Sequence, residues 1–213
     1  MWTPTTAERL SQTEEYYFSR KLREIDELNR QGKQVINLGI GSPDLPPHPS
    51  VVDELHAAAL RPDTHAYQSY KGSPVLRQAI ADWYRTSYGV PLDPDREILP
   101  LIGSKEGIMH VCMTFLNEGD EALVPNPGYP TYRSAVQLAG ARPLDYELKA
   151  EGGWMPDLQA LEAMDLSRVK LMWVNYPHMP TGAVADSASA TRALISPSRP
   201  PYWAISSCVL ATL

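Results

Sequence analysis

The chain has 213 residues, with 19 basic and 25 acidic side chains and a net charge of −6 at pH 7. This length predicts one or two domains with a real hydrophobic core. The acidic balance argues against a nucleic-acid surface, and no apolar run reaches the roughly 18 residues of a membrane helix. The N-terminus lacks the pattern of a secretory signal, and the two cysteines cannot form a disulfide framework. We therefore expect a cytoplasmic globular protein that binds neither nucleic acid nor membrane.

The first predicted element is a helix near the N-terminus. Ser11 and Glu14 have the spacing of a capping box. Apolar residues then recur at helical spacing until Gly32, which supplies a stop. Further along, the pattern predicts an extended run ending in glycines and two helices, the first capped by Ser50 and the second by Ser73. These elements cover residues 35–41, 51–60 and 74–89.

From residue 98 onward, short strands alternate with helices. The strands are expected over residues 98–103, 121–125, 142–148 and 170–176, and the helices over 105–116, 130–139 and 157–164. This alternation predicts an α/β fold with a mainly parallel sheet and flanking helices. Ligands of such sheets bind beyond the carboxyl ends of the strands.

The composition changes after Ala183. Residues 184–213 contain three charged side chains and no Gly, Glu or Lys. Neither helical nor alternating periodicity continues. We therefore interpret this segment as a tail that does not continue the α/β pattern, with a poorly packed natural C-terminus as the alternative.

Two segments at predicted strand ends carry possible chemistry. Gly103, Ser104 and Lys105 join a strand to a helix, and a helix N-terminus with small residues can bind an anion. An ordinary serine cap explains them as well, and the full phosphate-loop and dinucleotide motifs are absent. Tyr129 follows a tight Pro/Gly turn, where it can stack on a planar ligand or pack in the core.

Two further loops are candidates for ligand contacts. Glycines in the segment 37–44 leave backbone N–H groups open to a carboxylate. The loop 175–182 is made rigid by two prolines and contains His178, which has no metal-type spacing with other ligands. The nucleophile motif of serine hydrolases is absent as well.

In this order and spacing, the motifs resemble the class I/II aminotransferases, enzymes of fold type I that depend on pyridoxal 5′-phosphate (PLP). The resemblance covers about residues 11–183. It implies an N-terminal arm with part of a small domain over 1–48, an incomplete PLP-binding large domain over 49–183, and a tail without a match over 184–213.

The resemblance also implies roles for individual residues. Gly103, Ser104 and Lys105 match the family's phosphate cup, and Tyr129 matches the aromatic residue that stacks on the pyridine ring. Tyr67 matches a tyrosine that reaches the cofactor phosphate of the neighbouring subunit, which implies a homodimer.

On the substrate side, the resemblance places Gly41 at the backbone contact to the substrate carboxylate and Ile40 beside it. The expected substrates are an amino acid and a 2-oxo acid.

The sequence also departs from the family. Met179 stands where the family has an asparagine that donates to the cofactor's 3′-oxygen, and a thioether has no donor. Either the neighbouring His178 substitutes for it, or the cofactor's electronics are tuned differently in this chain. No residue matches the Schiff-base lysine or the aspartate at the pyridine nitrogen, so no catalytic residue is assigned. We expect a truncated, catalytically incomplete aminotransferase whose tail comes from a shifted reading frame.

Three other interpretations stay open. The chain can be a non-catalytic fragment that binds PLP, a phosphate group or a partner chain. It can descend from the C–S lyases or synthases that share this scaffold. An unrelated α/β phosphate-binding domain needs only the segment from Gly103 to Lys105, and it leaves the other motifs as coincidences.

Overall fold

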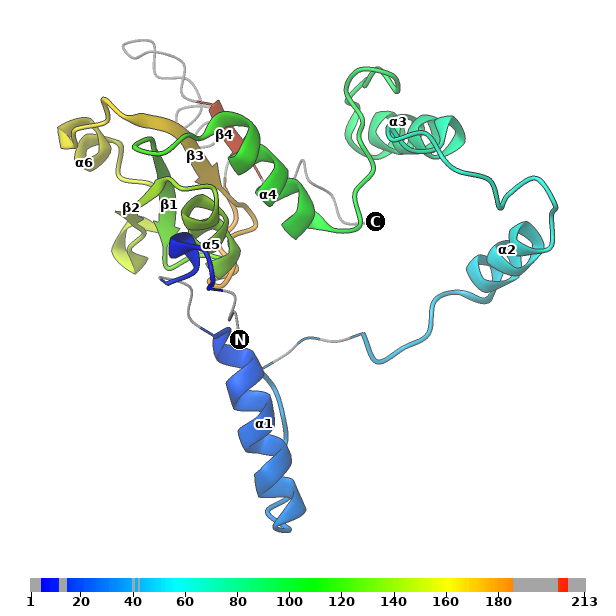
Figure 1. Cartoon of the computed structure of the whole chain (residues 1–213), viewed down its shortest axis with the longest axis horizontal. Helices are drawn as coiled ribbons and strands as arrows, with labels where there is room; N and C mark the ends of the chain where they lie inside the picture. Colours follow the sequence, from blue (N-terminus) through cyan, green and yellow to red (C-terminus); the bar gives the residue numbers. More distant parts are fainter. Residues whose placement is uncertain (1–4, 12–14, 40, 42, 186–202, 207–213) are drawn as a thin grey trace. The chain divides into compact units, whose positions relative to one another are not determined.

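The computed structural model describes residues 5–11, 15–39, 41, 43–185 and 203–206. The chain divides into two units by the contacts within it, and Figure 1 labels the helices and strands of both. The first unit comprises residues 14–100, and the second comprises residues 1–13 together with 101–213. These units separate between Pro100 and Leu101. They do not correspond to the domains expected from the resemblance, whose boundaries stay a prediction.

The first unit contains three helices. They are α1 (Tyr17–Arg30), α2 (Pro49–Ala59) and α3 (Pro74–Tyr88). Helix α1 does not begin at the predicted capping box, because Ser11 ends a short 3-10 turn, η1 (Glu8–Leu10), and Glu14 lies outside the described residues. The cap of α2 is also not Ser50: the imidazole of His48 accepts the Ser50 N–H, at 3.3 Å.

Helix α3 has the predicted boundaries. Pro74 occupies its first turn, and Gly89 ends it in the left-handed conformation with φ of 69°. Ser73 precedes the helix without a side-chain capping bond. The buried Arg77 holds α3 to the following turn, because it donates to the Pro94 carbonyl and to Asp95, both at 2.7 Å.

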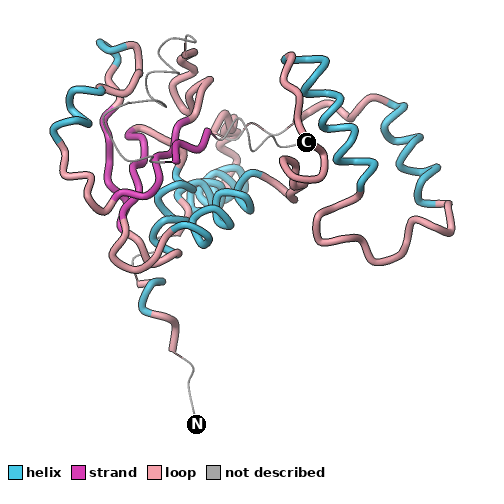
Figure 2. The backbone as a smooth tube through the Cα atoms, turned by 90° about the horizontal axis from the view of Figure 1, so that it is seen from above, coloured by secondary structure: helices cyan, strands magenta, loops and turns pink. Residues whose placement is uncertain are grey.

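The second unit is built on a parallel sheet, as predicted. The strand order is β2-β1-β3-β4, and every paired strand runs parallel to its neighbour. Figure 2 shows the strands gathered in one group, in magenta, with helices beside them. Its elements are α4 (Ser104–Phe115), β1 (Glu121–Asn126), α5 (Pro130–Leu138), β2 (Arg142–Glu147), η2 (Ala150–Gly152), α6 (Leu158–Ala163), β3 (Val169–Val174) and β4 (Trp203–Ser206).

Both faces of this sheet are covered at its central strands, which explains why β1 and β3 are buried almost throughout. Alternate residues of β1 and β3 pack with α4 and α5 on one face, around the fully buried Trp173. The residues between them, such as Leu123 and Met172, pack with α6 on the other face. Helices α4 and α5 lie side by side against the sheet (Figure 1), and this arrangement positions the candidate site.

The amino ends of the strands are joined by a buried carboxylate. Glu121 begins β1 with its side chain almost fully buried. It accepts from the Arg142 guanidinium, with Nε at 3.0 Å, and from Arg168, at 2.7 Å. A buried charge is tolerated when it is paired in this way, and the pairing ties β1 to β2 and to the start of β3.

Two predictions about strands are wrong. Residues 98–103 form no strand: they pair with none of the described strands, Ile102 is 98% exposed, and its N–H donates instead to the Glu106 carboxylate at 2.7 Å. In the tail, β4 pairs in parallel with β3, so the α/β pattern does continue at these four residues. The residues 186–202 and 207–213 lie outside the described part.

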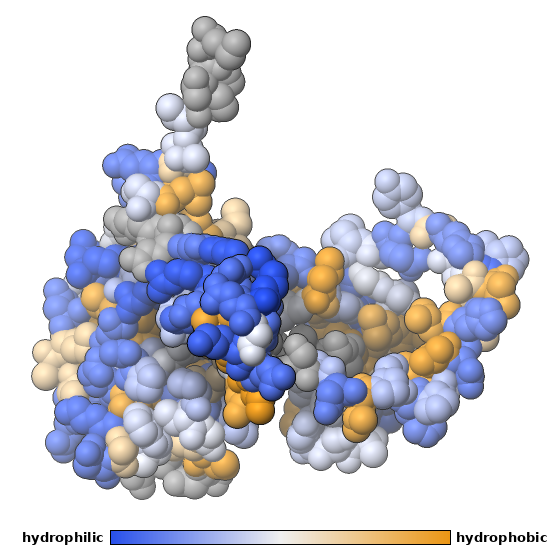
Figure 3. Space-filling view, turned by 90° about the horizontal axis from the view of Figure 1, so that it is seen from below, coloured by the Kyte–Doolittle hydropathy of each residue, from blue (hydrophilic) through white to orange (hydrophobic). Residues whose placement is uncertain are grey.

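Hydrophobic side chains are not confined to the core. Ile36, Leu38, Val75 and Ile102 are each at least 80% exposed, and Figure 3 shows hydrophobic surface among the hydrophilic residues on the face that it draws. No helix in the described part of the chain has the length and apolar character to span a membrane.

Candidate functional site

The candidate site lies where β1 and β3 end. These strands are parallel neighbours, so the loops that follow them, 127–129 and 175–182, leave the sheet at the same edge. The Pro127 carbonyl is near enough to the His178 imidazole to raise its pKa, so the two loops lie close to each other. The geometry therefore joins two of the segments that the sequence singled out.

The N-terminus of α4 belongs to the same unit as these two loops. Gly103 is the residue before the helix, and no side chain makes a capping bond there. The Ser104 hydroxyl is thus not used as a helix cap, contrary to the alternative explanation of this serine. The Glu106 carboxylate instead accepts the N–H of Ile102, the residue before Gly103. The first-turn N–H groups and the Ser104 hydroxyl form a donor set suited to an anion.

Tyr129 is held by a turn that requires glycine. A Cβ atom at Gly128 would lie 2.3 Å from the Pro125 carbonyl oxygen, closer than real atoms approach. The turn places Tyr129 directly before α5, half-buried. Its ring meets Tyr132 edge-on with centroids 5.7 Å apart, and Tyr132 stacks on Trp173 at 5.0 Å. The core residues Tyr132 and Trp173 thus support the Tyr129 ring from one side.

The structure brings Lys105 and Tyr129 together. The Lys105 Nζ lies 5.9 Å from the centroid of the Tyr129 ring, although Lys105 is in α4 and Tyr129 directly precedes α5. This distance is in the range of a cation–π contact. A positive side chain, an aromatic ring and a helix N-terminus therefore meet within one small region.

The loop after β3 is tightly bonded within itself. His178 donates its N–H to the Ala183 carbonyl and accepts the Gly182 N–H, both at 2.7 Å, and its Nδ1 is 2.8 Å from the Thr181 hydroxyl. Asn175 accepts the Met179 N–H at 3.1 Å. These bonds agree with the rigid loop that the prolines predicted. The Met179 side chain is 50% exposed.

His178 is a buried histidine, with 2% of its surface exposed. Burial lowers its pKa below the ordinary value, and the Pro127 carbonyl opposes this shift. The imidazole is therefore neutral at pH 7. Nearby, burial raises the pKa of Tyr176, whose hydroxyl donates to the Trp154 carbonyl at 2.6 Å.

The other predicted site residues lie elsewhere. Tyr67 and Gly41 are exposed residues of the first unit, and Ile40 lies outside the described residues. They belong to the first unit, whereas Lys105 and Tyr129 belong to the second, and each unit is described by itself. Their roles stay predictions.

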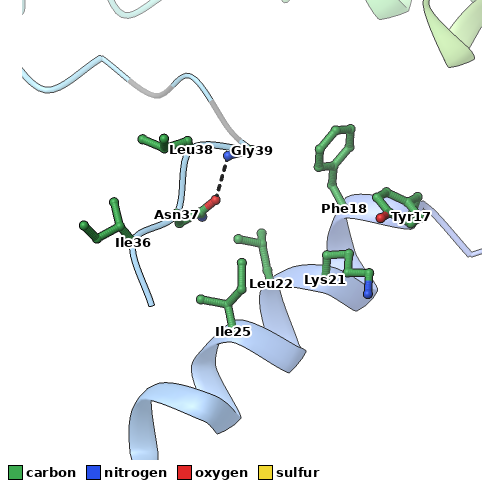
Figure 4. A pocket seen from close by; sticks show the side chains of 9 residues that line it. All are labelled: Tyr17, Phe18, Lys21, Leu22, Ile25, Ile36, Asn37, Leu38 and Gly39. Atoms are coloured by element: carbon green, nitrogen blue, oxygen red, sulfur yellow. Dashed lines mark hydrogen bonds between the residues drawn. The ribbon is translucent and has the colours of Figure 1, made fainter. Parts of the chain in front are cut away.

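The segment that leads to the predicted substrate loop lies along α1, as Figure 4 shows. Here Asn37 accepts the Gly39 N–H at 2.9 Å and so bends the chain. The two segments enclose a shallow groove of about 290 Å³. It is lined by Tyr17, Phe18, Lys21, Leu22, Ile25, Ile36, Asn37, Leu38 and Gly39.

One polar pair at the sheet edge was not singled out from the sequence. The Asn126 amide donates to Glu147 at 2.8 Å, and these are the last residues of β1 and β2. Their positions at two predicted strand ends were the available signal. Among the described residues, no group of three or more His, Cys, Asp or Glu is arranged to hold a metal ion.

Comparison with known proteins gives relatives for most of the chain. LL-diaminopimelate aminotransferase from Moorella thermoacetica is 46% identical over 180 residues, which are 84% of this chain and 46% of the relative. Transaminase BacF from Bacillus subtilis is 42% identical over 176 residues, or 83% of this chain and 44% of the relative. The chain thus spans about half the length of these curated relatives.

Solved structures agree in fold. Substrate-bound BacF from Bacillus subtilis matches with a TM-score of 0.82 and 39% identity, over 90% of this chain and 49% of that one. Aspartate aminotransferase from Thermotoga maritima matches with a TM-score of 0.85 and 25% identity, over 94% and 53%. The family model "Aminotransferase class I and II" matches residues 33–194. The chain therefore belongs to the class I and II aminotransferases, a family of PLP-dependent enzymes.

Proposed function

We propose that this chain forms the part of a PLP-dependent aminotransferase that binds the cofactor's phosphate and ring. The main support is the meeting of Lys105 with the Tyr129 ring, at 5.9 Å, beside the N-terminus of α4. The residues fit the cofactor because they offer what its parts need. The N–H groups and hydroxyl at Ser104 suit a phosphate, and the half-buried Tyr129 suits a planar ring.

Each part of the proposed site has a separate task. Ser104 and the first-turn amides hold the phosphate, while Tyr129 supports one face of the ring and keeps water from it. The backbone of Gly41 binds the carboxylate of the substrate, beside Ile40. When bound, PLP supplies an electron sink for reactions at the amino-acid α-carbon.

The proposed reaction class is transfer of an amino group between an amino acid and a 2-oxo acid. The relatives support this class, but they are named for different enzymes, an LL-diaminopimelate aminotransferase and a transaminase BacF. We infer no particular substrate from them. We also propose a cytoplasmic homodimer in which the fully exposed Tyr67 reaches the cofactor phosphate of the second copy.

No residue of the 213-residue sequence matches the family's Schiff-base lysine or its ring-nitrogen aspartate, so we assign no residue of it to the transfer step. A C–S lyase or synthase on the same scaffold would bind the cofactor in the same way. Product analysis of a catalytically complete relative would separate these reaction types.

Titration with PLP and with pyridoxal, which lacks the phosphate, tests the proposal. Charge-assisted hydrogen bonds contribute about 1.5–3 kcal/mol each, and about 1.4 kcal/mol is tenfold in affinity. We therefore expect PLP to bind at least tenfold more tightly, with intrinsic tyrosine and tryptophan fluorescence as the signal. Ser104→Ala should weaken PLP binding about tenfold by the same reasoning.

Thr114→Ala is the matched control for Ser104→Ala. Thr114 is on the same helix, and its hydroxyl donates to the His110 carbonyl at 2.7 Å, away from the N-terminus. This variant should leave the affinity unchanged. Equal affinities for PLP and pyridoxal, or equal effects of the two substitutions, would contradict the proposal.

A second function, association with a further polypeptide, is favoured by exposed apolar residues before the start of α4 and in its last turn. Ile102, Met113 and Phe115 are 98%, 65% and 45% exposed, and the last two are on α4. Large exposed apolar side chains mark interaction surfaces. Light scattering over a range of concentrations tests this function. A chain that stays monomeric and unchanged by Met113→Glu would exclude it.

A further inference from the structure

The amine of Lys105 occupies an unusual place for a surface lysine. Lys105 is in the first turn of α4, and its side chain is exposed. Its Nζ nevertheless lies 5.9 Å from the centroid of the half-buried Tyr129 ring. A cation in the first turn of a helix is unfavourable next to the helix dipole; Glu106 in the same turn offsets this in part, and a bound anion would offset it further. The position thus combines a reason to bind an anion with an amine beside an aromatic ring.

The chemistry of PLP connects these two features. Its phosphate-bearing arm and its aldehyde are on neighbouring carbons of the same ring. A phosphate at the amides of Ser104 and Lys105, with the ring against Tyr129, would bring the aldehyde close to the Lys105 amine. Sequence resemblance assigns Lys105 to the cofactor phosphate only, whereas the Lys105 amine lies beside the Tyr129 ring.

We propose that Lys105 forms a covalent imine with the aldehyde of PLP bound at this site. The inference rests on the proposed function, since it needs the phosphate and the ring to be held as described. In the step, the ammonium group first loses its proton, and the nitrogen lone pair attacks the aldehyde carbon. A carbon–nitrogen double bond replaces the carbon–oxygen double bond, and the oxygen leaves as water.

The chain offers five other lysines for comparison. All six are in the described part, and five of them, including Lys105, are exposed. In the second unit, Lys170 is near the amino end of β3, at the opposite edge of the sheet from the site. Lys149 follows the carboxyl end of β2 and is the more demanding control. If exposure alone decided which lysines react with PLP, Lys149 and Lys170 would react as readily as Lys105.

Anchoring of the phosphate makes a measurable difference between them. A ligand tethered beside its target reaches an effective concentration in the millimolar range. At PLP concentrations of about 0.1 mM, the anchored reaction at Lys105 should exceed reaction at the other exposed lysines about tenfold. Pyridoxal has no phosphate, so it should label the exposed lysines without this preference.

The test is reductive trapping on the full chain. PLP is added, borohydride reduces any imine to a stable secondary amine, and peptide mass spectrometry locates the adduct. We expect the adduct on Lys105, about tenfold above Lys149 and Lys170. Lys105→Arg keeps the positive charge but has no primary amine, so it should lose the adduct. Lys149→Arg should leave the Lys105 adduct unchanged.

The outcomes separate this inference from the proposed function. If PLP binds more tightly than pyridoxal but the adduct spreads evenly, or falls on another lysine such as Lys71, the role of Lys105 is wrong and the phosphate site stands. If PLP and pyridoxal bind and label alike, the proposed function fails as well. If Lys105→Arg forms as much adduct as the unchanged chain, on other lysines, the inference is also overturned.

Discussion

Replacing Gly128 with alanine would put a methyl group inside the turn that carries Tyr129. The added Cβ would lie 2.3 Å from the Pro125 carbonyl oxygen and 2.7 Å from the Pro125 ring, whereas non-bonded carbon atoms prefer about 3.5–4.0 Å. The obstacle cannot move easily, because Pro125 is a buried residue of β1, which pairs with both β2 and β3. We therefore place the cost near the upper end of overpacking, at about 3 kcal/mol.

Thermal unfolding measures this cost. For a chain of this size, each kcal/mol shifts the midpoint by about 2–4 °C, so Gly128→Ala should lower Tm by roughly 6–12 °C. Gly152→Ala is the matched control, because its Cβ would enter open space without a positive φ. It should leave Tm nearly unchanged.

The same substitution should disturb the candidate site. Displacing the Tyr129 ring removes a stacking contribution of about 0.5–1.5 kcal/mol, which corresponds to a loss of up to about tenfold in PLP affinity. The affinity is measured at a temperature where the variant is folded. If Gly128→Ala unfolds within about 0.5 kcal/mol of the unchanged chain, the turn is not built as described and this reasoning fails.

Three further results are expected. The fold lowers the pKa of His178, so protonation of its imidazole destabilises the folded state, and the free energy of unfolding should fall as pH drops below about 6.5. Chemical denaturation of His178→Gln should show a weaker dependence of this free energy on pH, and an unchanged dependence would contradict the prediction. Burial raises the pKa of Cys112 to about 12, so mass spectrometry at pH 8 should find its thiol unlabelled until the chain unfolds, and rapid native labelling would contradict its burial. Tyr146→Phe removes a buried hydroxyl that donates to the Trp173 carbonyl at 2.6 Å, which should cost about 1–3 kcal/mol in denaturant unfolding; a neutral effect would show that this bond does not stabilise the sheet.

The alternation of strands and helices was readable from sequence because of how the sheet is covered. Its central strands β1 and β3 are buried on both faces, so they appear as short apolar runs between helices. Local signals were also sufficient at α3, where Pro74 and Gly89 mark the two ends. They were insufficient for α1, since Ser11 belongs to a separate 3-10 turn.

The two errors about strands have one physical cause. A strand is defined by the neighbour that accepts and donates its backbone hydrogen bonds, and composition does not reveal that neighbour. Residues 98–103 have the composition of a strand and find no partner among the described strands. The segment Trp203–Ser206 follows a stretch without periodicity and still pairs with β3.

The same limit applies to the site. Sequence order identified Lys105 and Tyr129 one at a time, because each follows a predicted strand. Their proximity depends on the packing of α4 beside α5, which no local pattern contains. The burial of His178 likewise follows from the way the loops after β1 and β3 meet.

The central claim is that one anion site, at the start of α4 and beside Tyr129, receives the phosphate and ring of PLP. Backbone amide resonances of the isotope-labelled chain, followed during PLP addition, test this claim most directly. We expect the largest shifts at Ser104, Lys105 and Tyr129, and smaller shifts at the first two when pyridoxal is used. Saturable PLP binding that leaves these three amides unchanged would contradict the account.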